Sequence, residues 1–409
     1  MHKTIRFIFY NVIVVLRSLG ALEWTLNYFM NHIEQAPKGI KSALRTYFLQ
    51  RECNIIQYDS ELAKYDSSLF YVLRPGDHRF RNRRFDTRFQ VNSAGYRDHE
   101  GDETAPSIIC LGDSHTMGWG VNQGLDFPTL LEGELDATVL NMGVSSYGIV
   151  RELKALEQVF LDSLDWLVIQ YCYNDHYENQ TFLNEGRYLP ITEEQFYDQA
   201  CANNRKNTKY FPGKHLLHLP DFLLKEKRKS TKKSEIEFAG KKRTYAPVEA
   251  FWEVLRKDSL IPPKAQILIL DIESHASDNA FIDELKKRVQ QDMAIGLSDR
   301  IHFLRFDGQL NASYRLGIDP HLNEAGHQLV AEKIGTQIRE TDLFTGQNAW
   351  FYPDSKDTAM TCTYQNGLKH GTLTMFWENG NISRKENYQH GSLIAPAQNF
   401  DINGQIRSQ

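Results

Sequence analysis

Five short apolar runs alternate with helix-like segments through the middle of the chain, and this alternation constrains the fold more than any other feature. The runs cover residues 108–111, 138–141, 167–171, 266–270 and 301–306. Helical patterns stand between them, as at residues 127–135 and 149–161. Such alternation is typical of a parallel sheet covered by helices on both faces. We therefore predict an α/β fold with three layers, α/β/α, around a five-stranded parallel sheet.

The first of these runs ends in the turn Gly112-Asp113-Ser114. Open parallel sheets bind ligands at the edge where the carboxyl ends of their strands meet. A serine at this edge is exposed and lies close to the positive end of the following helix, which suits a nucleophile. Gly-Asp-Ser is also ordinary turn chemistry, because Gly tolerates unusual φ and both Asp and Ser cap backbone amides. The tripeptide alone leaves both interpretations open.

The next two strands end in residues that can donate hydrogen bonds to an anion. Residues 139–148 contain Gly143, whose backbone N–H can approach a ligand without interference from a Cβ. Residues 166–175 end at Asn174 and Asp175, and the neutral Asn174 amide can stabilise an oxyanion without titrating. A strand-to-helix turn at Gly143 and a helix cap at Asn174 are the alternative interpretations.

A fourth block, at residues 319–327, precedes an amphipathic helix at 328–338. A histidine that accepts a serine proton must be held in one tautomer, and a neighbouring carboxylate does this. We expect His321 to be the base and Asp319 the orienting acid. His327 is the rival base, which we expect to be structural. Right-handed crossovers place all four blocks on one edge of the sheet.

The four blocks, in this order, resemble the motifs of the SGNH (GDSL-like) hydrolases. The resemblance covers roughly residues 85–340, and residues 88–97 resemble the segment that precedes the first block in one branch of these proteins. It implies a flavodoxin-like α/β/α fold and ester cleavage through an acyl-serine intermediate, with no metal and no cofactor. It also implies catalytic roles for Ser114, His321 and Asp319, and an oxyanion hole made by Ser114, Gly143 and Asn174.

This sequence departs from the family pattern at two positions. Cys172 stands where many relatives have Gly, two residues before the asparagine. Asp319 and His321 are spaced Asp-x-His, whereas the most quoted spacing is Asp-x-x-His. In the second departure, one residue instead of two separates the expected acid from the expected base.

Charge and cysteine content narrow the classes of partner. The formal net charge of −5 argues against a nucleic-acid-binding protein. The five cysteines are odd in number and lack metal-ligand spacing, so we expect neither a disulfide framework nor a metal site. The expected partner is a small-molecule ester or a saccharide or lipid ester.

Residues 1–35 form an expected apolar or amphipathic helix. Lys3 and Arg6 precede the densest apolar run, at 7–16, and the charged residues Arg17 and Glu23 interrupt the helix beyond this run. A spanning or signal anchor, an interfacial helix and a helix docked on the protein itself all stay open. The location is correspondingly open between membrane, cell envelope and cytoplasm.

The hydrolase-like domain is expected at 106–345, and three further segments lie before, within and after it. Residues 36–105 read as an irregular lead-in with a basic run at 78–88, either a solvated face or an anion-binding surface. An insertion at 181–262 is either a lid over the serine or a surface excursion. Residues 360–409 repeat Asn-Gly and His-Gly turns and resemble bacterial MORN-type repeats, which implies a small β-hairpin appendage. This tail either contacts protein or lipid or is a structural cap.

Three functions are compatible with these features. The first is an esterase acting on an O-acyl, O-acetyl or lipid-like ester. The second is an O-acyltransferase, in which a saccharide hydroxyl intercepts the same acyl-enzyme. The third is a non-catalytic protein that binds partners through the repeat tail.

Overall fold

The computed structural model describes residues 2–101, 103–231, 244–273, 280–292, 300–343, 346–352, 357–365, 368–389 and 392–408. Its centre is a five-stranded, all-parallel sheet with the order β6-β5-β7-β8-β9. The strands are β5 (Ile108–Leu111), β6 (Val139–Asn141), β7 (Trp166–Tyr171), β8 (Gln266–Asp271) and β9 (Ile301–Leu304). Numbered along the chain, this order is 2-1-3-4-5, the order of the flavodoxin-like sheet. The predicted parallel sheet is confirmed.

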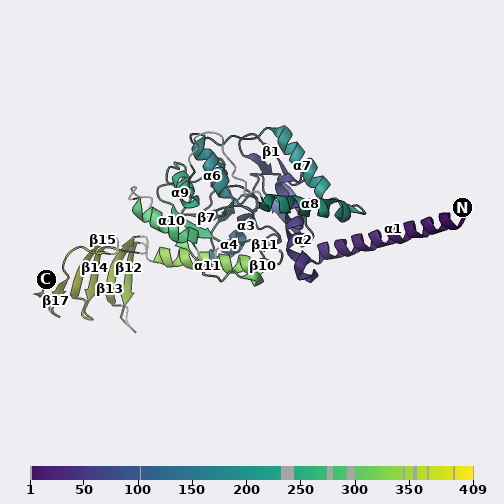
Figure 1. Ribbon diagram of the computed structural model, residues 1–409. Coiled ribbons are helices and arrows are strands. Elements are labelled where there is room, and N and C mark those ends of the chain that lie inside the picture. The colour runs from purple at the N-terminus through teal and green to yellow at the C-terminus, as the bar shows by residue number, and fades with distance from the viewer. Residues whose placement is uncertain are drawn as a thin grey trace.

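Helices cover both faces of this sheet because its strands bury alternate side chains on opposite sides. Ile109 and Leu167 pack with α5 (Ile149–Ala155), α9 (Pro247–Leu255) and α10 (Ala280–Gln291). Cys110 and Val168 pack on the other face with α4 (Phe127–Leu135) and α11 (Glu324–Leu343). The result is a three-layer α/β/α body (Figure 1).

The lead-in at 36–105 is not irregular, and that expectation is wrong. It holds the helix α2 (Lys38–Arg51) and two antiparallel hairpins, β1 (Ala63–Asp66) with β2 (Phe70–Leu73) and β3 (Gly76–Arg81) with β4 (Asp86–Val91). Phe80 and Phe89 of the second hairpin are buried against Met117 and Trp119, just after the serine turn. Phe80 of β3, with Phe89 and Val91 two residues apart on β4, supplies this contact.

The basic run at 78–88 lies on the β3–β4 hairpin and is largely ion-paired. Its pairs are Arg79 and Arg81 with Asp86, Arg83 with Glu52, and Arg84 with Glu34. Two of these partners lie between residues 30 and 55, so the run joins the hairpin to the N-terminal helices.

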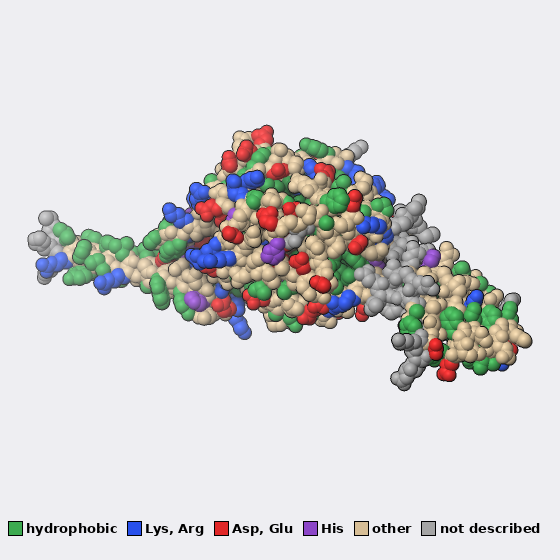
Figure 2. All heavy atoms as spheres, turned by 180° about the vertical axis from the view of Figure 1, so that it is seen from behind, with side chains coloured by type: hydrophobic (Ala, Val, Ile, Leu, Met, Phe, Trp, Pro, Cys, Tyr) green, Lys and Arg blue, Asp and Glu red, His purple; other side chains and the backbone are tan. Residues whose placement is uncertain are grey.

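The N-terminal helix α1 (His2–Asn31) projects from the body (Figure 1). Residues Thr4–Asn31 are long and apolar enough to cross a membrane, and this apolar stretch is not buried against the rest of the chain. Hydrophobic side chains cover much of the projecting helix in Figure 2. The C-terminal third is different, because Glu23 and Met30 are buried where α1 meets the body.

The insertion at 181–262 contains α7 (Glu194–Thr208), α8 (Lys214–Thr231) and α9, and it begins inside α6 (Asp175–Asn184). Leu219 and Phe222 of α8 are buried in one cluster with Met30 and Phe48. The apolar part of the insertion therefore packs on α1 and α2, an alternative that the lid and excursion interpretations did not include. The side chains of 226–231 and all of 232–243 lie outside the described residues.

The C-terminal region is an antiparallel sheet at the opposite end of the molecule from α1 (Figure 1). Its strands are β12 (Gly346–Phe351), β13 (Thr358–Gln365), β14 (Leu368–Phe376), β15 (Ile382–Gln389), β16 (Ser392–Leu393), β17 (Gln398–Phe400) and β18 (Ile406–Ser408). The sheet begins at residue 346, before the expected boundary at 360. The Asn-Gly and His-Gly pairs at 366–367 and 390–391, where the sequence predicts turns, lie outside the described residues, and the MORN-type repeat stays a prediction.

Candidate active site

Ser114 follows β5 after Gly112 and Asp113, as the first residue of the short helix α3 (Ser114–Met117). Asp113 caps this helix, since its carboxylate accepts the His115 N–H at 3.0 Å. Ser114 is buried except for a small fraction of its surface. The serine hydroxyl therefore sits at the carboxyl edge of the sheet, where the sequence predicts it.

Two neighbours hold the serine turn in place. An added Cβ on Gly112 would lie 2.1 Å from Thr116 Oγ1, so only glycine allows α3 to come this close to the strand. The buried Gln170 amide oxygen accepts the Thr116 hydroxyl at 3.1 Å and the Asp113 N–H at 3.3 Å. Gln170 lies on β7, the strand beside β5, and its role was not predicted from the sequence.

His321 and Asp319 lie on β11 (Asp319–Leu322), which pairs with β10 (Arg315–Leu316). Residues two apart on a strand point to the same face, so the Asp-x-His spacing brings both side chains together. His321 Nε2 lies 2.7 Å from Ser114 Oγ. His321 Nδ1 contacts Asp319 Oδ1, which also accepts the His321 backbone N–H at 3.0 Å. The structure thus brings Ser114, His321 and Asp319 into one hydrogen-bonded chain.

The Asp319 carboxyl is 2% exposed yet stays ionised. Its burial alone would raise its pKa. The charge of His321, with hydrogen bonds from His321 and Trp119, outweighs burial and holds the pKa of Asp319 below its ordinary value. A buried carboxylate of this kind can orient an imidazole and stabilise its charged form.

Trp119 is a further contact of this pair that the sequence analysis missed. Its indole Nε1–H donates to Asp319 Oδ2 at 3.0 Å, and its ring stacks on His321 with 5.0 Å between centroids. A buried indole N–H usually needs an acceptor. The signal in the sequence was a tryptophan five residues after the serine, because its indole N–H would need an acceptor if it were buried.

The two other histidines near the site are neutral and buried. His327 Nδ1 accepts the Phe127 N–H at 3.2 Å at the start of α4, and burial lowers the pKa of His327 to about 3. His115 packs 4.8 Å from the His321 ring, and burial followed by nearby positive charges lowers its pKa well below the ordinary value. His327 therefore contacts α4 rather than the serine.

The three expected oxyanion donors differ in whether they already make a hydrogen bond within the chain. The Ser114 N–H begins α3 and so has no acceptor within its helix. Asn174 precedes α6, is exposed and makes no capping hydrogen bond, so the helix-cap interpretation of its side chain is wrong. The Gly143 N–H donates to Asn141 Oδ1 at 3.0 Å and is already engaged.

Gly143 has a second, steric reason to be glycine. A Cβ there would lie 2.2 Å from the Met117 backbone nitrogen, so the loop after β6 packs directly on α3. The residue thus positions the serine helix whether or not its N–H contacts a substrate.

Two carboxyl groups, Glu152 on α5 and Asp175 at the start of α6, are buried. Glu152 and Asp175 are each 1% exposed. Burial first, then nearby carboxylates, raise the pKa of both well above the ordinary value; these carboxylates are Asp113 and Glu178 for Glu152, and Glu152 and Asp113 for Asp175. Both groups therefore favour their neutral, protonated forms.

Cys172 is not a competing nucleophile. Its thiol is buried, burial raises its pKa, and its S–H donates to Glu273 Oε1 at 3.1 Å. Within the described ranges, no three His, Cys, Asp or Glu side chains converge as metal ligands would.

Comparisons with known proteins found solved structures only. No family model and no curated protein matches the chain. A member of the lipolytic G-D-S-L family from Veillonella parvula is 15% identical, with 55% of this chain and 94% of that chain covered and a TM-score of 0.28. An acetyl xylan esterase from Butyrivibrio proteoclasticus is 13% identical (58% and 64% covered, TM-score 0.31). A phospholipase A1 from Streptomyces albidoflavus is 11% identical (57% and 99% covered, TM-score 0.28). The structural neighbours are thus lipolytic proteins and carbohydrate esterases.

Proposed function

We propose that this chain is an SGNH-type serine hydrolase that cleaves carboxylic esters through an acyl-serine intermediate. One observation carries the proposal: Ser114 Oγ lies 2.7 Å from His321 Nε2, and the other ring nitrogen of His321 contacts the buried Asp319 carboxylate. A nucleophile, a base within hydrogen-bond reach and a group that orients the base are the parts that acyl transfer requires.

In the proposed reaction, Ser114 Oγ attacks the ester carbonyl carbon while His321 Nε2 takes the hydroxyl proton. Asp319 stabilises the imidazolium and keeps Nδ1 protonated. The Ser114 N–H and the Asn174 amide donate to the tetrahedral oxyanion. His321 then returns the proton to the departing alcohol, and water, activated by His321, releases the acid and restores Ser114. Gly143 is the third donor, provided that its N–H turns from Asn141 Oδ1 toward the oxyanion.

The experiment is hydrolysis of p-nitrophenyl esters from acetate to palmitate by the full chain. We expect saturable turnover with an optimum chain length, because an acyl group must fit beside Ser114. Addition of saccharide hydroxyls as competing acceptors separates hydrolysis from acyl transfer: the acid alone supports the hydrolase, and acylated saccharide supports the transferase. A folded chain that turns over no ester and transfers no acyl group would contradict both.

Replacing Asn174 with alanine is expected to lower kcat about 10²–10³-fold with little change in KM. The amide would contact the oxyanion and not the ground-state carbonyl, and loss of one such donor has this cost in other hydrolases. Steady-state kinetics on the best ester measure it. Asn203→Ala, on the exposed surface of α7, is the matched control. Equal loss in both variants, or none in Asn174→Ala, removes Asn174 from the oxyanion hole.

We also propose that α1 anchors the chain to a membrane. Its apolar side chains, among them Phe7, Phe9 and Leu16, are more than half exposed. Glu23 is held by the body, because it accepts the His215 and Leu216 N–H groups at 3.3 and 3.0 Å. Residues 4–22, which include Arg6 and Arg17, are left to enter a bilayer, and their length is close to the ~20 residues that a hydrocarbon core requires.

A further inference from the structure

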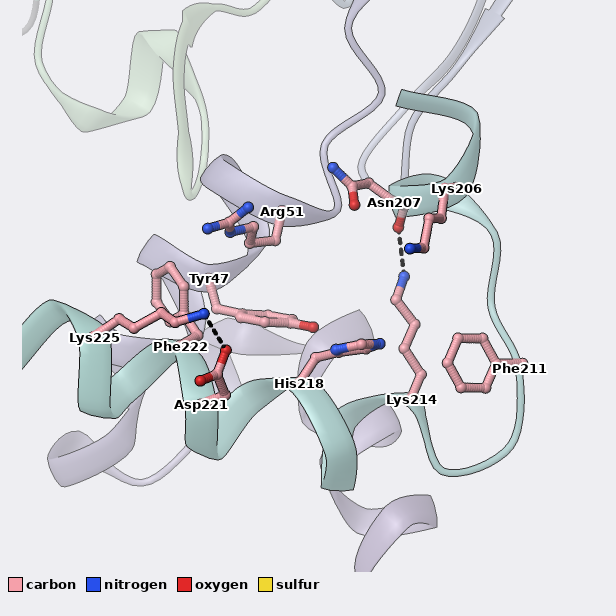
Figure 3. Close-up of a pocket in the computed structure, with 10 residues that line it drawn as sticks. All are labelled: Tyr47, Arg51, Lys206, Asn207, Phe211, Lys214, His218, Asp221, Phe222 and Lys225. Atoms are coloured by element: carbon pink, nitrogen blue, oxygen red, sulfur yellow. Dashed lines mark hydrogen bonds and ion pairs between the residues drawn. The ribbon is translucent and has the colours of Figure 1, made fainter. Parts of the chain in front are cut away.

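A cavity of about 190 Å³ lies between α2, the end of α7 and α8 (Figure 3). This is far more than the roughly 10–15 Å³ that one water needs. Phe222 forms part of its wall and also belongs to the apolar cluster that receives α1. The ester chemistry proposed above makes no use of this cavity, which lies beside the root of the projecting helix.

The cavity is fixed relative to α1 by a buried polar network. The His215 ring lies between two carboxylates, with Nδ1 3.1 Å from Glu23 of α1 and Nε2 3.1 Å from Glu52 at the end of α2. His215 and Glu52 are at most 3% exposed. Any surface made by α2 and the start of α8 therefore keeps its position beside α1.

Four cationic side chains surround the cavity: Arg51 of α2, Lys206 near the end of α7, and Lys214 and Lys225 of α8 (Figure 3). Asp221 is the carboxylate in the lining, and it pairs with Lys225 at 2.8 Å. The excess of positive charge favours an anionic occupant.

These cations differ in how firmly they are held. Lys214 is 4% exposed, and its ammonium lies 3.0 Å from Glu52 and donates to the Asn207 carbonyl. Arg51 and Lys206 are exposed, and no carboxylate pairs with either of them within the described part of the chain. Lys214 is thus a fixed donor, and two further cations are free to close on a ligand.

The remaining polar groups can donate as well. Figure 3 shows the Tyr47 hydroxyl pointing toward the His218 ring. Burial, then the charge of Glu52, raises the pKa of Tyr47 to about 12, so its hydroxyl keeps its proton. Lys and Arg have donors and no acceptors. A ligand with several acceptor oxygens matches this lining, and phosphate offers them in a geometry that Lys and Arg bind well.

We propose that this cavity binds a phosphate group, supplied by the headgroup of an anionic lipid or by a free phosphate. For the lipid source the inference rests on the proposed anchoring of α1, since the anchor would bring α2 and α8 to the headgroup layer. For the free source it rests on the cavity alone.

The test compares two double variants of the full chain. Arg51→Gln/Lys206→Gln removes the two free cations of the cavity. Lys38→Gln/Lys209→Gln removes two exposed cations from the start of α2 and from just beyond α7, outside the cavity. Both variants change the net charge equally, so the general attraction to an anionic surface falls equally in both. Turnover of a soluble short-chain ester, expected to equal wild type in both, shows that they are folded.

The lipid arm is flotation with phosphatidylcholine vesicles, alone or mixed with phosphatidylglycerol. Wild type is expected to bind both kinds and the mixed vesicles more tightly. The cavity variant is expected to lose about tenfold more affinity for the mixed vesicles than the control variant, and to bind neutral vesicles as wild type does. This outcome assigns the cavity to a lipid headgroup.

The soluble arm is titration of the detergent-solubilised chain with inorganic phosphate and with glycerol phosphate, followed by calorimetry. One outcome is that the cavity variant loses phosphate binding, the control variant keeps it, and the two variants bind vesicles equally. This outcome assigns the cavity to a free phosphate. Equal behaviour of the two variants in both arms overturns the proposal. Failure to bind any vesicle, with phosphate binding intact, contradicts the membrane anchor and leaves the phosphate site supported.

Discussion

Replacing Ser114 with alanine is expected to reduce ester turnover to the background of the assay while the chain stays folded. Loss of the nucleophile in a serine hydrolase triad costs about 10⁶-fold in kcat. The change removes one oxygen, whose hydrogen-bond partner is His321, and leaves the apolar core of the serine turn untouched. Thermal unfolding of the variant is therefore expected to match wild type closely.

The matched control for this variant is Ser107→Ala. Ser107 precedes the same strand, β5, but lies at its amino end, where its hydroxyl donates to the Thr138 carbonyl at 3.1 Å. We expect Ser107→Ala to keep full turnover. A fluorophosphonate probe should label wild type and Ser107→Ala, but not Ser114→Ala. Turnover that survives in Ser114→Ala would assign the chemistry to another residue and overturn the proposed mechanism.

Replacing Asp319 with asparagine is expected to lower kcat/KM about 10⁴-fold, which is less than the loss in Ser114→Ala. The new amide can donate to His321 Nδ1 and so stabilises the tautomer that carries its proton on Nε2. That nitrogen then cannot accept the Ser114 proton. The side chain keeps its size, so no cavity is opened in the structure.

Trp119→Phe is a milder change to the same group of contacts. It keeps an aromatic ring beside His321 but removes the indole N–H that donates to Asp319 Oδ2. Loss of one hydrogen bond to a charged group predicts a decrease of about tenfold or more. Steady-state kinetics on one ester rank the three variants. Wild-type activity in Asp319→Asn would remove Asp319 from the mechanism, whatever Trp119→Phe does.

The sequence predicted the central sheet well because its strands are buried on both faces. Each strand is then a short continuous apolar run, and the runs at 108–111, 167–171 and 266–270 lie within a residue of observed strands. The expected positions of Ser114, Gly143 and Asn174, after β5, β6 and β7, have a related reason. The carboxyl ends of parallel strands meet at one edge, so residues that come after different strands lie together there.

Prediction from the sequence was poorer where one element packs on another far along the chain. Residues 36–105 were expected to be irregular. Strands β1 to β4 are short and gain stability from contacts with distant residues, such as that of Phe80 with Trp119, so their local pattern does not show them. The apolar stretch of α8 gave no sign of its partner, since amphipathicity shows which face is buried but not against what. Its partners, α1 and α2, lie more than 150 residues before it in the chain.

The sequence by itself determined the parallel sheet, the edge that carries Ser114, and the shared face of Asp319 and His321. These features depend on local periodicity: apolar runs form strands, and positions two apart on a strand point the same way. The tertiary structure alone decided that Trp119 donates to Asp319 across 200 residues and that α8 packs against the C-terminal end of α1. Hydrogen bonds and packing between distant elements depend on how the whole chain closes, which local periodicity does not specify.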